Sequence, residues 1–246
     1  MKAYRSNTGT GDPISGRSIL KTLGLWIALA VVVTIASWYL AKAFEPAAWK
    51  TAQVRAVLLV AEVYALLPVA VLLIYGGLNG LRVRVKLRYT GLKDIGLGIA
   101  MFVGLAVVLL LLYMGMGAIS GSLWHPGKEL ISKATDMSRL PTADAVTWAL
   151  ILVRVFLLAG LAEELLFRGL LFGWLRKKYT AVPTIAIVTL LFTIEHIYPI
   201  AFPAAIVFSV GLGWLRERTG SILPGLIVHI LTDSSMLLVA WMLVRR

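Results

Sequence analysis

The sequence predicts an all-α protein, a polytopic bundle of transmembrane helices with about seven to eight membrane segments. Three observations lead to this fold class. Apolar residues make up 59% of the 246 residues and charged residues only 15%, where a soluble domain has about a quarter charged. The mean hydropathy of the chain is +0.87. Long uncharged stretches also end at basic residues, as 22–41 does between Lys21 and Lys42.

The charge balance and the cysteine count narrow the class further. Lys and Arg number 24 against 12 Asp and Glu, which gives a formal net charge of +12. In so apolar a chain we expect the basic excess to flank spans of a lipid bilayer, and we expect no nucleic-acid partner. Because the chain has no cysteine, disulfides, thiolate catalysis, iron–sulfur clusters and cysteine-ligated zinc are excluded.

The N-terminal half is predicted to hold three membrane segments. Residues 1–17 are polar and rich in Ser, Gly and Thr, and we expect them to be disordered. The first span, 22–41, is too long and too far into the chain for a signal peptide, so we expect it to stay uncleaved. The second span, 56–81, contains a single acidic residue, Glu62, and the third covers 95–119.

Four further apolar segments follow a polar connection at 120–144. The first of them contains Arg154 besides the residues discussed below, and the last ends close to the final residue. The four segments cover 145–175, 182–198, 199 or 201 to 215, and 222–244.

The basic loops predict the orientation, because short cytoplasmic loops carry the Lys and Arg excess. With the N-terminus inside, the 120–144 connection falls outside. Seven segments then leave the basic pair 245–246 outside, an exception that an eighth element or a bend at 233–235 would remove. Three basic clusters fall on the inner side: the loop 82–93, the cluster 176–178 and a turn at 216–218.

Ionisable side chains inside the predicted spans are the main functional signal. Such a group costs roughly 3 kcal/mol at the bilayer centre on insertion scales, so each is a functional hypothesis. All but one lie in the C-terminal half, which divides the chain into a plain membrane part (18–144) and a part that carries the chemistry (145–246). The residues are Glu62, Glu163, Glu164, Glu195, Asp233, His196 and His229.

Depth and spacing bring four of these residues together. From helix rise, Glu163 and His196 each lie about 20 Å from the inner boundary, His229 about 12 Å and Asp233 about 18 Å. They can therefore share one slab of the membrane. His229 and Asp233 are also four residues apart, and this spacing places them on one helix face.

Glu164 and Arg168 have the same spacing, so the arginine can neutralise Glu164 and leave Glu163 free. Adjacent glutamates on a helix point about 100° apart, and we therefore expect different roles for them. The structural alternative is that these polar residues only hold neighbouring helices together. For the Glu164–Arg168 pair this alternative stays open.

Three motifs on successive membrane segments resemble a known family. An EExxxR motif lies at 163–168, FxxxH at 192–196 and HxxxN/D at 229–233. Their order resembles the CPBP (Abi) intramembrane proteases, which include the type II CAAX prenyl endopeptidases and bacterial bacteriocin-processing or immunity proteins. The resemblance covers about 145–237. Asp233 stands where the CAAX branch typically has Asn, and Glu195 precedes the motif histidine, so the CAAX specificity stays open.

The resemblance implies a protease in the inner (plasma) membrane of a prokaryote, with 145–246 as its catalytic core. It would hydrolyse a peptide bond of a membrane-associated or lipidated protein or peptide precursor. Such hydrolysis needs an activated water, a proton donor for the leaving amine and a stabilised oxyanion. The roles are Glu163 as base, His196 holding the water, His229 polarising the carbonyl, Asp233 orienting His229, and Glu164–Arg168 as the supporting pair.

Other readings stay open at this point. We expect no cofactor or metal, with zinc bound by Glu163, His196, His229 and Asp233 as the alternative. A proton-coupled transporter would also use membrane carboxylates and histidines, although the internal repeats of transporters are not evident. A non-catalytic immunity or scaffold member of the same family is a further alternative. Neither Arg154 nor Glu195 has an assigned role.

Overall fold

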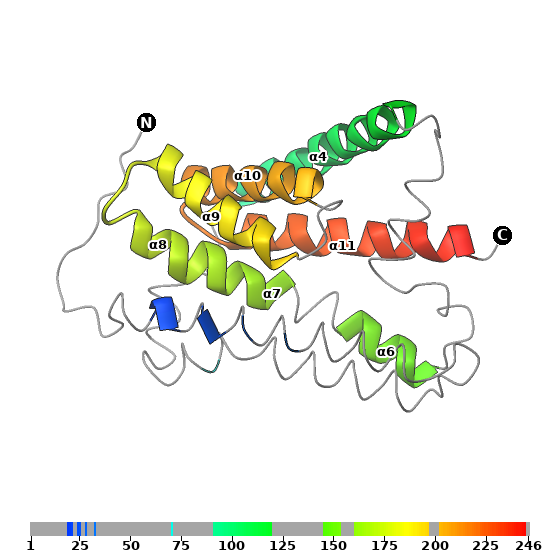
Figure 1. Ribbon diagram of the computed structural model, residues 1–246, viewed down its shortest axis with the longest axis horizontal. Coiled ribbons are helices and arrows are strands. Elements are labelled where there is room, and N and C mark those ends of the chain that lie inside the picture. The colour runs from blue at the N-terminus through cyan, green and yellow to red at the C-terminus, as the bar shows by residue number, and fades with distance from the viewer. Residues whose placement is uncertain are drawn as a thin grey trace.

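The computed structural model describes residues 91–119, 145–153, 160–196 and 202–244, with a few positions nearer the N-terminus. Every regular element in these ranges is a helix, so the all-α class is confirmed for the described part of the chain. The elements are α4 (Leu92–Ile119), α6 (Ala145–Val153), α7 (Gly160–Glu163), η4 (Glu164–Leu171), α8 (Phe172–Leu175), α9 (Ala181–Glu195), α10 (Phe202–Thr219) and α11 (Leu223–Val244). Figure 1 labels the α-helices, and the unlabelled η4 joins α7 to α8.

Part of the sequence prediction falls outside the described residues and stays a prediction. This holds for the polar N-terminal segment, for most of the first two spans, for both long connections and for the last two residues. The positions concerned include 1–17, 82–90, 120–144 and 245–246, together with Glu62 and Arg154.

The predicted segments agree with the described helices in four cases. The segments 95–119, 182–198, 199–215 and 222–244 correspond to α4, α9, α10 and α11 within a few residues. The segment 145–175 is described in two parts, α6 up to Val153 and then α7, η4 and α8, which follow one another directly from Gly160. Residues 154–159 lie outside the described part, so the continuity of this segment stays a prediction.

The predicted turn at 216–218 is wrong. These residues form the last turn of α10, which ends at Thr219. Gly220, with φ of 68°, follows the helix and donates its N–H to the carbonyl of Arg216. A left-handed glycine after the last turn is a common helix terminator, and it places the arginines of 216–218 inside the helix.

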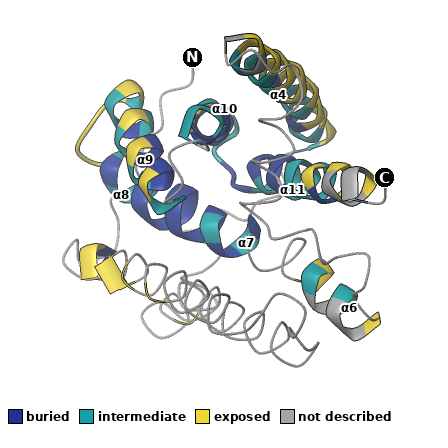
Figure 2. Cartoon of the chain, turned by 45° about the vertical axis from the view of Figure 1, so that its right-hand side comes forward, coloured by how far each residue is buried: buried dark blue, intermediate teal, exposed yellow. Residues whose placement is uncertain are grey.

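Helix α4 matches a membrane span. Its 25-residue stretch Leu92–Met116 is long and apolar enough to cross a bilayer, and only 11% of its apolar window is buried. Figure 2 shows its exposed side turned away from the other helices. It is the one helix of the described ranges that meets this test. Helix α9, with 15 residues, spans about 22 Å, less than a bilayer core of about 30 Å, so the total of seven or eight spans stays a prediction.

Helix α10 lies at the centre of the described helices and contacts α9, α4, α11 and η4. In Figure 2 it is seen end-on between α9 and α4. Two glycines explain its close contacts. A Cβ at Gly211 would lie 3.2 Å from Sδ of Met101 on α4, and one at Gly213 would lie 3.2 Å from Ile185 on α9.

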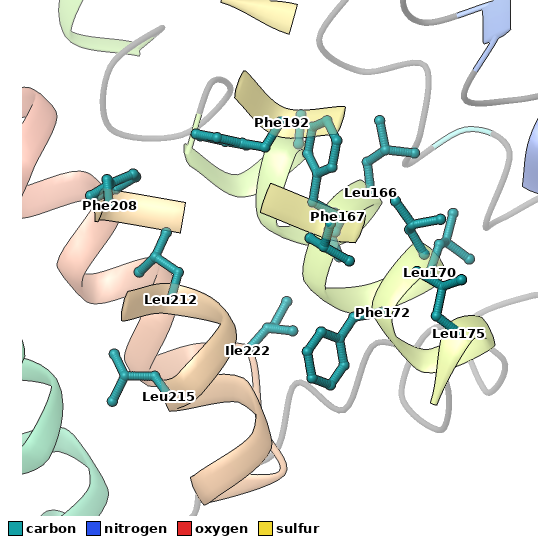
Figure 3. Packing of buried hydrophobic residues seen from close by; sticks show 14 of the residues in the cluster. Leu166, Phe167, Leu170, Phe172, Leu175, Phe192, Phe208, Leu212, Leu215 and Ile222 are labelled. Carbon is teal, nitrogen blue, oxygen red and sulfur yellow. The ribbon is translucent and has the colours of Figure 1, made fainter. Parts of the chain in front are cut away.

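The core lies where η4, α8, α9 and α10 meet, and Figure 3 shows its side chains. Phe167 of η4 and Phe192 of α9 are both fully buried, and their rings meet edge to face with centroids 5.3 Å apart. Leu212 and Leu215 of α10 are also fully buried. This packing fixes η4 against its neighbours, and η4 carries two of the predicted site residues.

The element η4 is a π-helix, and all eight of its residues are buried. Its bonding is seen where Phe172 donates its N–H to the carbonyl of Phe167, five residues earlier. An α-helix would use the carbonyl four residues earlier. Short π-helical segments inside α-helices are often found at functional sites, and this one begins at Glu164.

Candidate active site

Three carboxylates surround the imidazole of His229. Nδ1 of His229 lies 3.1 Å from Oε1 of Glu164. On the other side of the ring, Nε2 lies 3.6 Å from Oε2 of Glu163 and 3.6 Å from Oδ2 of Asp233. The adjacent glutamates at the junction of α7 and η4 therefore face different nitrogens of one histidine on α11.

Burial divides this cluster into an inner and an outer half. The side chains of Glu164 and His229 are 0% and 4% exposed, whereas those of Glu163 and Asp233 are 19% and 29% exposed. The two outer carboxylates flank Nε2. A substrate group can therefore approach His229 from the Nε2 side, while the Nδ1 side is closed by protein.

Arg168 extends the inner half of the cluster. Its Nη1 lies 3.0 Å from the same Oε1 of Glu164 that faces His229, and both side chains of this i, i+4 pair are fully buried. Its Nη2 donates to Oγ of Ser209 on α10 at 2.9 Å, and its guanidinium lies 4.5 Å from the ring centroid of Phe192. One carboxylate oxygen of Glu164 thus links Arg168 to His229.

Glycines allow the helices that carry the cluster to approach one another. A Cβ at Gly225 of α11 would lie 3.1 Å from Oε2 of Glu164, and one at Gly160 of α7 would lie 3.8 Å from Cγ of His229. Gly225 was not singled out from the sequence. The available signal is its spacing, because Gly225, His229 and Asp233 follow each other at intervals of four on one helix face.

His196 lies at the C-terminal end of α9, next to the cluster rather than within it. Its Nδ1 lies 2.9 Å from the carbonyl of Phe192, and since a carbonyl only accepts, Nδ1 carries the proton and a neutral ring leaves Nε2 as acceptor. The ring centroids of His196 and Phe192 are 4.6 Å apart. The ring of Phe192 also lies 6.3 Å from that of His229, so this phenylalanine is a neighbour of both histidines.

The zinc alternative requires Glu163, His196, His229 and Asp233 to converge on one point. Because Nδ1 of His196 bonds to a main-chain carbonyl, only its Nε2 could ligate a metal. Among the residues that the structure describes, no group of three or more His, Asp or Glu side chains could hold a metal ion. The described side chains as arranged do not form that ligand set.

Sequence reasoning missed three residues of α10 that contact the cluster. Phe208 meets the ring of His229 edge to face at 4.9 Å, and Ser209 accepts the bond from Arg168. Arg216 was assigned to a basic turn at the membrane surface. It is 3% exposed and donates Nε to the carbonyl of Arg168 at 2.9 Å. Glu195, whose role was left open, is half-buried.

Comparison with known protein families gives a match over residues 145–235, to the model described as Type II CAAX prenyl endopeptidase Rce1-like. The match covers just over a third of the chain. No curated protein and no solved structure matches the chain. The matched segment includes every residue of the His229 cluster, together with Arg168 and His196.

Members of the matched family are proteases of membranes, and the exposed apolar helix α4 fits a transmembrane protein. The family agrees with the one that the three sequence motifs resemble. Over residues 145–235, the chain is thus similar to the Rce1-like type II CAAX prenyl endopeptidases.

Proposed function

We propose that the chain is an intramembrane endopeptidase that uses Glu163 to activate a water molecule for peptide-bond hydrolysis. The observation that supports this most is the position of Nε2 of His229 between the two partly exposed carboxylates of Glu163 and Asp233. The opposite nitrogen is held by the buried Glu164. One side of the imidazole is thus fixed and the other faces the place where substrate can enter.

Glu163 is the general base in this proposal. Its carboxylate is the outer member of the adjacent pair, and it is not committed to Arg168, whose guanidinium pairs with Glu164. A carboxylate held away from bulk water is a stronger base than one in solution. Glu163 removes a proton from water as the oxygen attacks the peptide carbonyl carbon, and it returns that proton to the leaving amine when the C–N bond breaks.

His229 stabilises the oxyanion in this scheme. The carboxylate of Glu164 only accepts hydrogen bonds, so Nδ1 of His229 carries a proton. In the cationic ring Nε2 is a donor as well, and it is the atom on the open side of the cluster. Preorganised donors of this kind stabilise the developing negative charge more in the transition state than in the bound substrate.

Asp233 and His196 complete the proposed site. Asp233 lies 3.6 Å from Nε2, one helical turn after His229, and its role is to hold the ring in place from the open side. His196 reaches the attacking water through Nε2, because Nδ1 is fixed by the carbonyl of Phe192. Arg168 and Glu164 support His229 from inside.

The substrate in this proposal is a membrane-associated protein or peptide precursor. The family description names prenylated CAAX substrates, and Asp233 stands where the CAAX branch typically has Asn. We extend the proposal to a prokaryotic inner membrane and to a chain that crosses it several times, as the hydropathy of the sequence predicts.

A cleavage assay with matched variants tests the proposal. Purified chain in liposomes is mixed with a farnesylated CAAX peptide and with the same peptide unprenylated, and membrane proteins that accumulate in a deletion strain supply further candidates. Glu163→Gln should lower cleavage by roughly 10²–10⁴-fold, whereas Glu217→Gln, which alters a partly exposed glutamate paired with Arg176, should leave it intact. Equal turnover by wild type and Glu163→Gln would exclude Glu163 as the base.

A further inference from the structure

Arg168 is held at both of its ends by one face of α10. At the tip of the side chain, Nη2 donates to Oγ of Ser209 at 2.9 Å. At the main chain, the carbonyl of Arg168 accepts a bond from Nε of Arg216 at 2.9 Å. Ser209 and Arg216 are seven residues apart on α10, which is two helical turns, and they are 0% and 3% exposed.

The π-helix explains why the main-chain carbonyl of Arg168 accepts a hydrogen bond from Arg216. Phe172 bonds to the carbonyl of Phe167, five residues back, while Arg176 in the next turn bonds to Phe172, four residues back. Where bonding changes from five residues to four, one carbonyl in between is skipped. A skipped buried carbonyl needs another donor. The carbonyl of Arg168 lies in this interval, and Arg216 supplies that donor.

The position of Arg168 affects His229 through Glu164, which contacts both residues. Its Nη1 lies 3.0 Å from Oε1 of Glu164, and the same oxygen lies 3.1 Å from Nδ1 of His229. All of these side chains except His229 are fully buried, and His229 nearly so. A shift of Arg168 must therefore move Glu164 or break one of these two contacts.

We infer that Ser209 and Arg216 are positioning residues for peptide hydrolysis, because together they hold Arg168 and thereby fix Glu164 against His229. The inference rests on the proposed function. It assigns a task to Arg216, a buried arginine of α10 that bonds to a carbonyl of the π-helix.

A purely mechanical tie between the same parts of the chain is present nearby and serves as a control. Arg176, just after α8, pairs with Glu217 of α10 through two bonds, Nε to Oε2 at 2.8 Å and Nη2 to Oε1 at 3.1 Å. This pair is partly exposed. Breaking it loosens α10 from the segment after η4 without removing either contact to Arg168.

The test measures kcat and KM of Ser209→Ala, Arg216→Met, Arg216→Lys and the control Glu217→Gln on the peptide that wild type cleaves. Displacement of a catalytic group by about 1 Å costs on the order of 100-fold in rate. We expect Arg216→Met to lose on the order of 100-fold in kcat and Ser209→Ala about 10-fold, with KM within about threefold of wild type. Arg216→Lys, which keeps a donor, should recover most of the loss.

A second measurement needs no substrate. Amide hydrogen exchange over residues 164–172 should speed up in Arg216→Met and stay unchanged in Glu217→Gln, because local opening follows the loss of local bonds. This arm separates the two proposals. If wild type cleaves no peptide, the proposed function fails, yet unchanged exchange in Arg216→Met would still overturn the positioning role.

The kinetic outcomes are equally distinct. A loss confined to KM, or an equal loss in Glu217→Gln and Arg216→Met, would show that α10 contributes packing alone and would overturn the inference. If Arg216→Met does not fold, Ser209→Ala and Arg216→Lys decide by the same criterion. Loss of kcat in Ser209→Ala with wild-type kinetics in Glu217→Gln supports the inference.

Discussion

Nδ1 of His229 lies 3.1 Å from Oε1 of the buried Glu164, whereas Glu163, the preceding residue, lies on the other side of the ring, 3.6 Å from Nε2. Two chemically identical neighbours thus occupy different environments. Glu164 is closed in with Arg168 at 3.0 Å, and Glu163 faces the partly exposed side. This difference separates a residue that holds the site together from one that can meet a substrate.

The first prediction contrasts the two glutamates. Glu163→Gln should lower kcat by roughly 10²–10⁴-fold, as expected when a general base is removed, with little change in thermal stability. Glu164→Gln should lower activity and thermal stability together, because it leaves Arg168 as an uncompensated buried charge. Cleavage rates and thermal unfolding in one detergent check both variants. A Glu163→Gln chain that unfolds early but still cleaves would reverse the assignment.

The second prediction concerns Arg168. Arg168→Ala removes the cation that neutralises a fully buried carboxylate, and breaking such a pair costs about 3–5 kcal/mol. The detergent-extracted variant should therefore unfold at a clearly lower temperature and lose activity. Lys178→Ala is the control, because this exposed lysine lies over the ring of Trp174, away from the cluster. Full thermal stability of Arg168→Ala combined with inactivity would instead indicate a direct catalytic role.

Local geometry explains what the sequence predicted about the site. Glu164 with Arg168, and His229 with Asp233, are i, i+4 pairs, and this spacing alone makes neighbours of their side chains on a helix. The structure contains both pairs. The all-α class followed from composition in the same direct way, because apolar segments of this length in a membrane favour helices.

Contacts between helices could not be predicted in this way. The sequence paired Glu164 with Arg168 alone, yet Glu164 also faces Nδ1 of His229, and this contact depends on how the α7–η4 segment packs against α11. The π-helical bonding of η4 leaves no spacing signal in the sequence. Arg216 was misplaced because a basic run fits a cytoplasmic loop and a final helical turn equally well, although Gly220 marks the true end of the helix.

The third prediction uses the close approach of α11 to Glu164. In Gly225→Ala the new Cβ would lie 3.1 Å from Oε2 of Glu164, so the carboxylate must shift relative to His229. We expect kcat to fall about 10-fold with KM nearly unchanged. Gly104→Ala on α4 is the control, because its Cβ would meet nothing within 4 Å and alanine favours a helix by about 1 kcal/mol.

The stability measurement separates the two glycine variants further. Gly104→Ala should be as stable as wild type or slightly more so. Gly225→Ala should lack this gain, since the helical preference of alanine is offset by strain at Glu164. Identical kinetics for Gly225→Ala and Gly104→Ala would show that the position of Glu164 does not limit turnover.

The last prediction concerns metal, for which the water-activation scheme and a zinc site give opposite results. In the scheme, His196 and His229 position water and substrate, so the purified chain should carry no stoichiometric zinc and should keep its activity after prolonged treatment with EDTA. The expectation rests on the roles proposed for these histidines and on the described side chains, in which no group of three or more His, Asp or Glu could hold a metal ion. If both histidines were ligands, each His→Ala change should release metal, since three remaining donors rarely hold zinc as well as four. Elemental analysis of wild type and both variants, read beside activity before and after chelation, decides between them. One zinc per chain, with activity lost on its removal and restored on its return, would overturn the metal-free assignment.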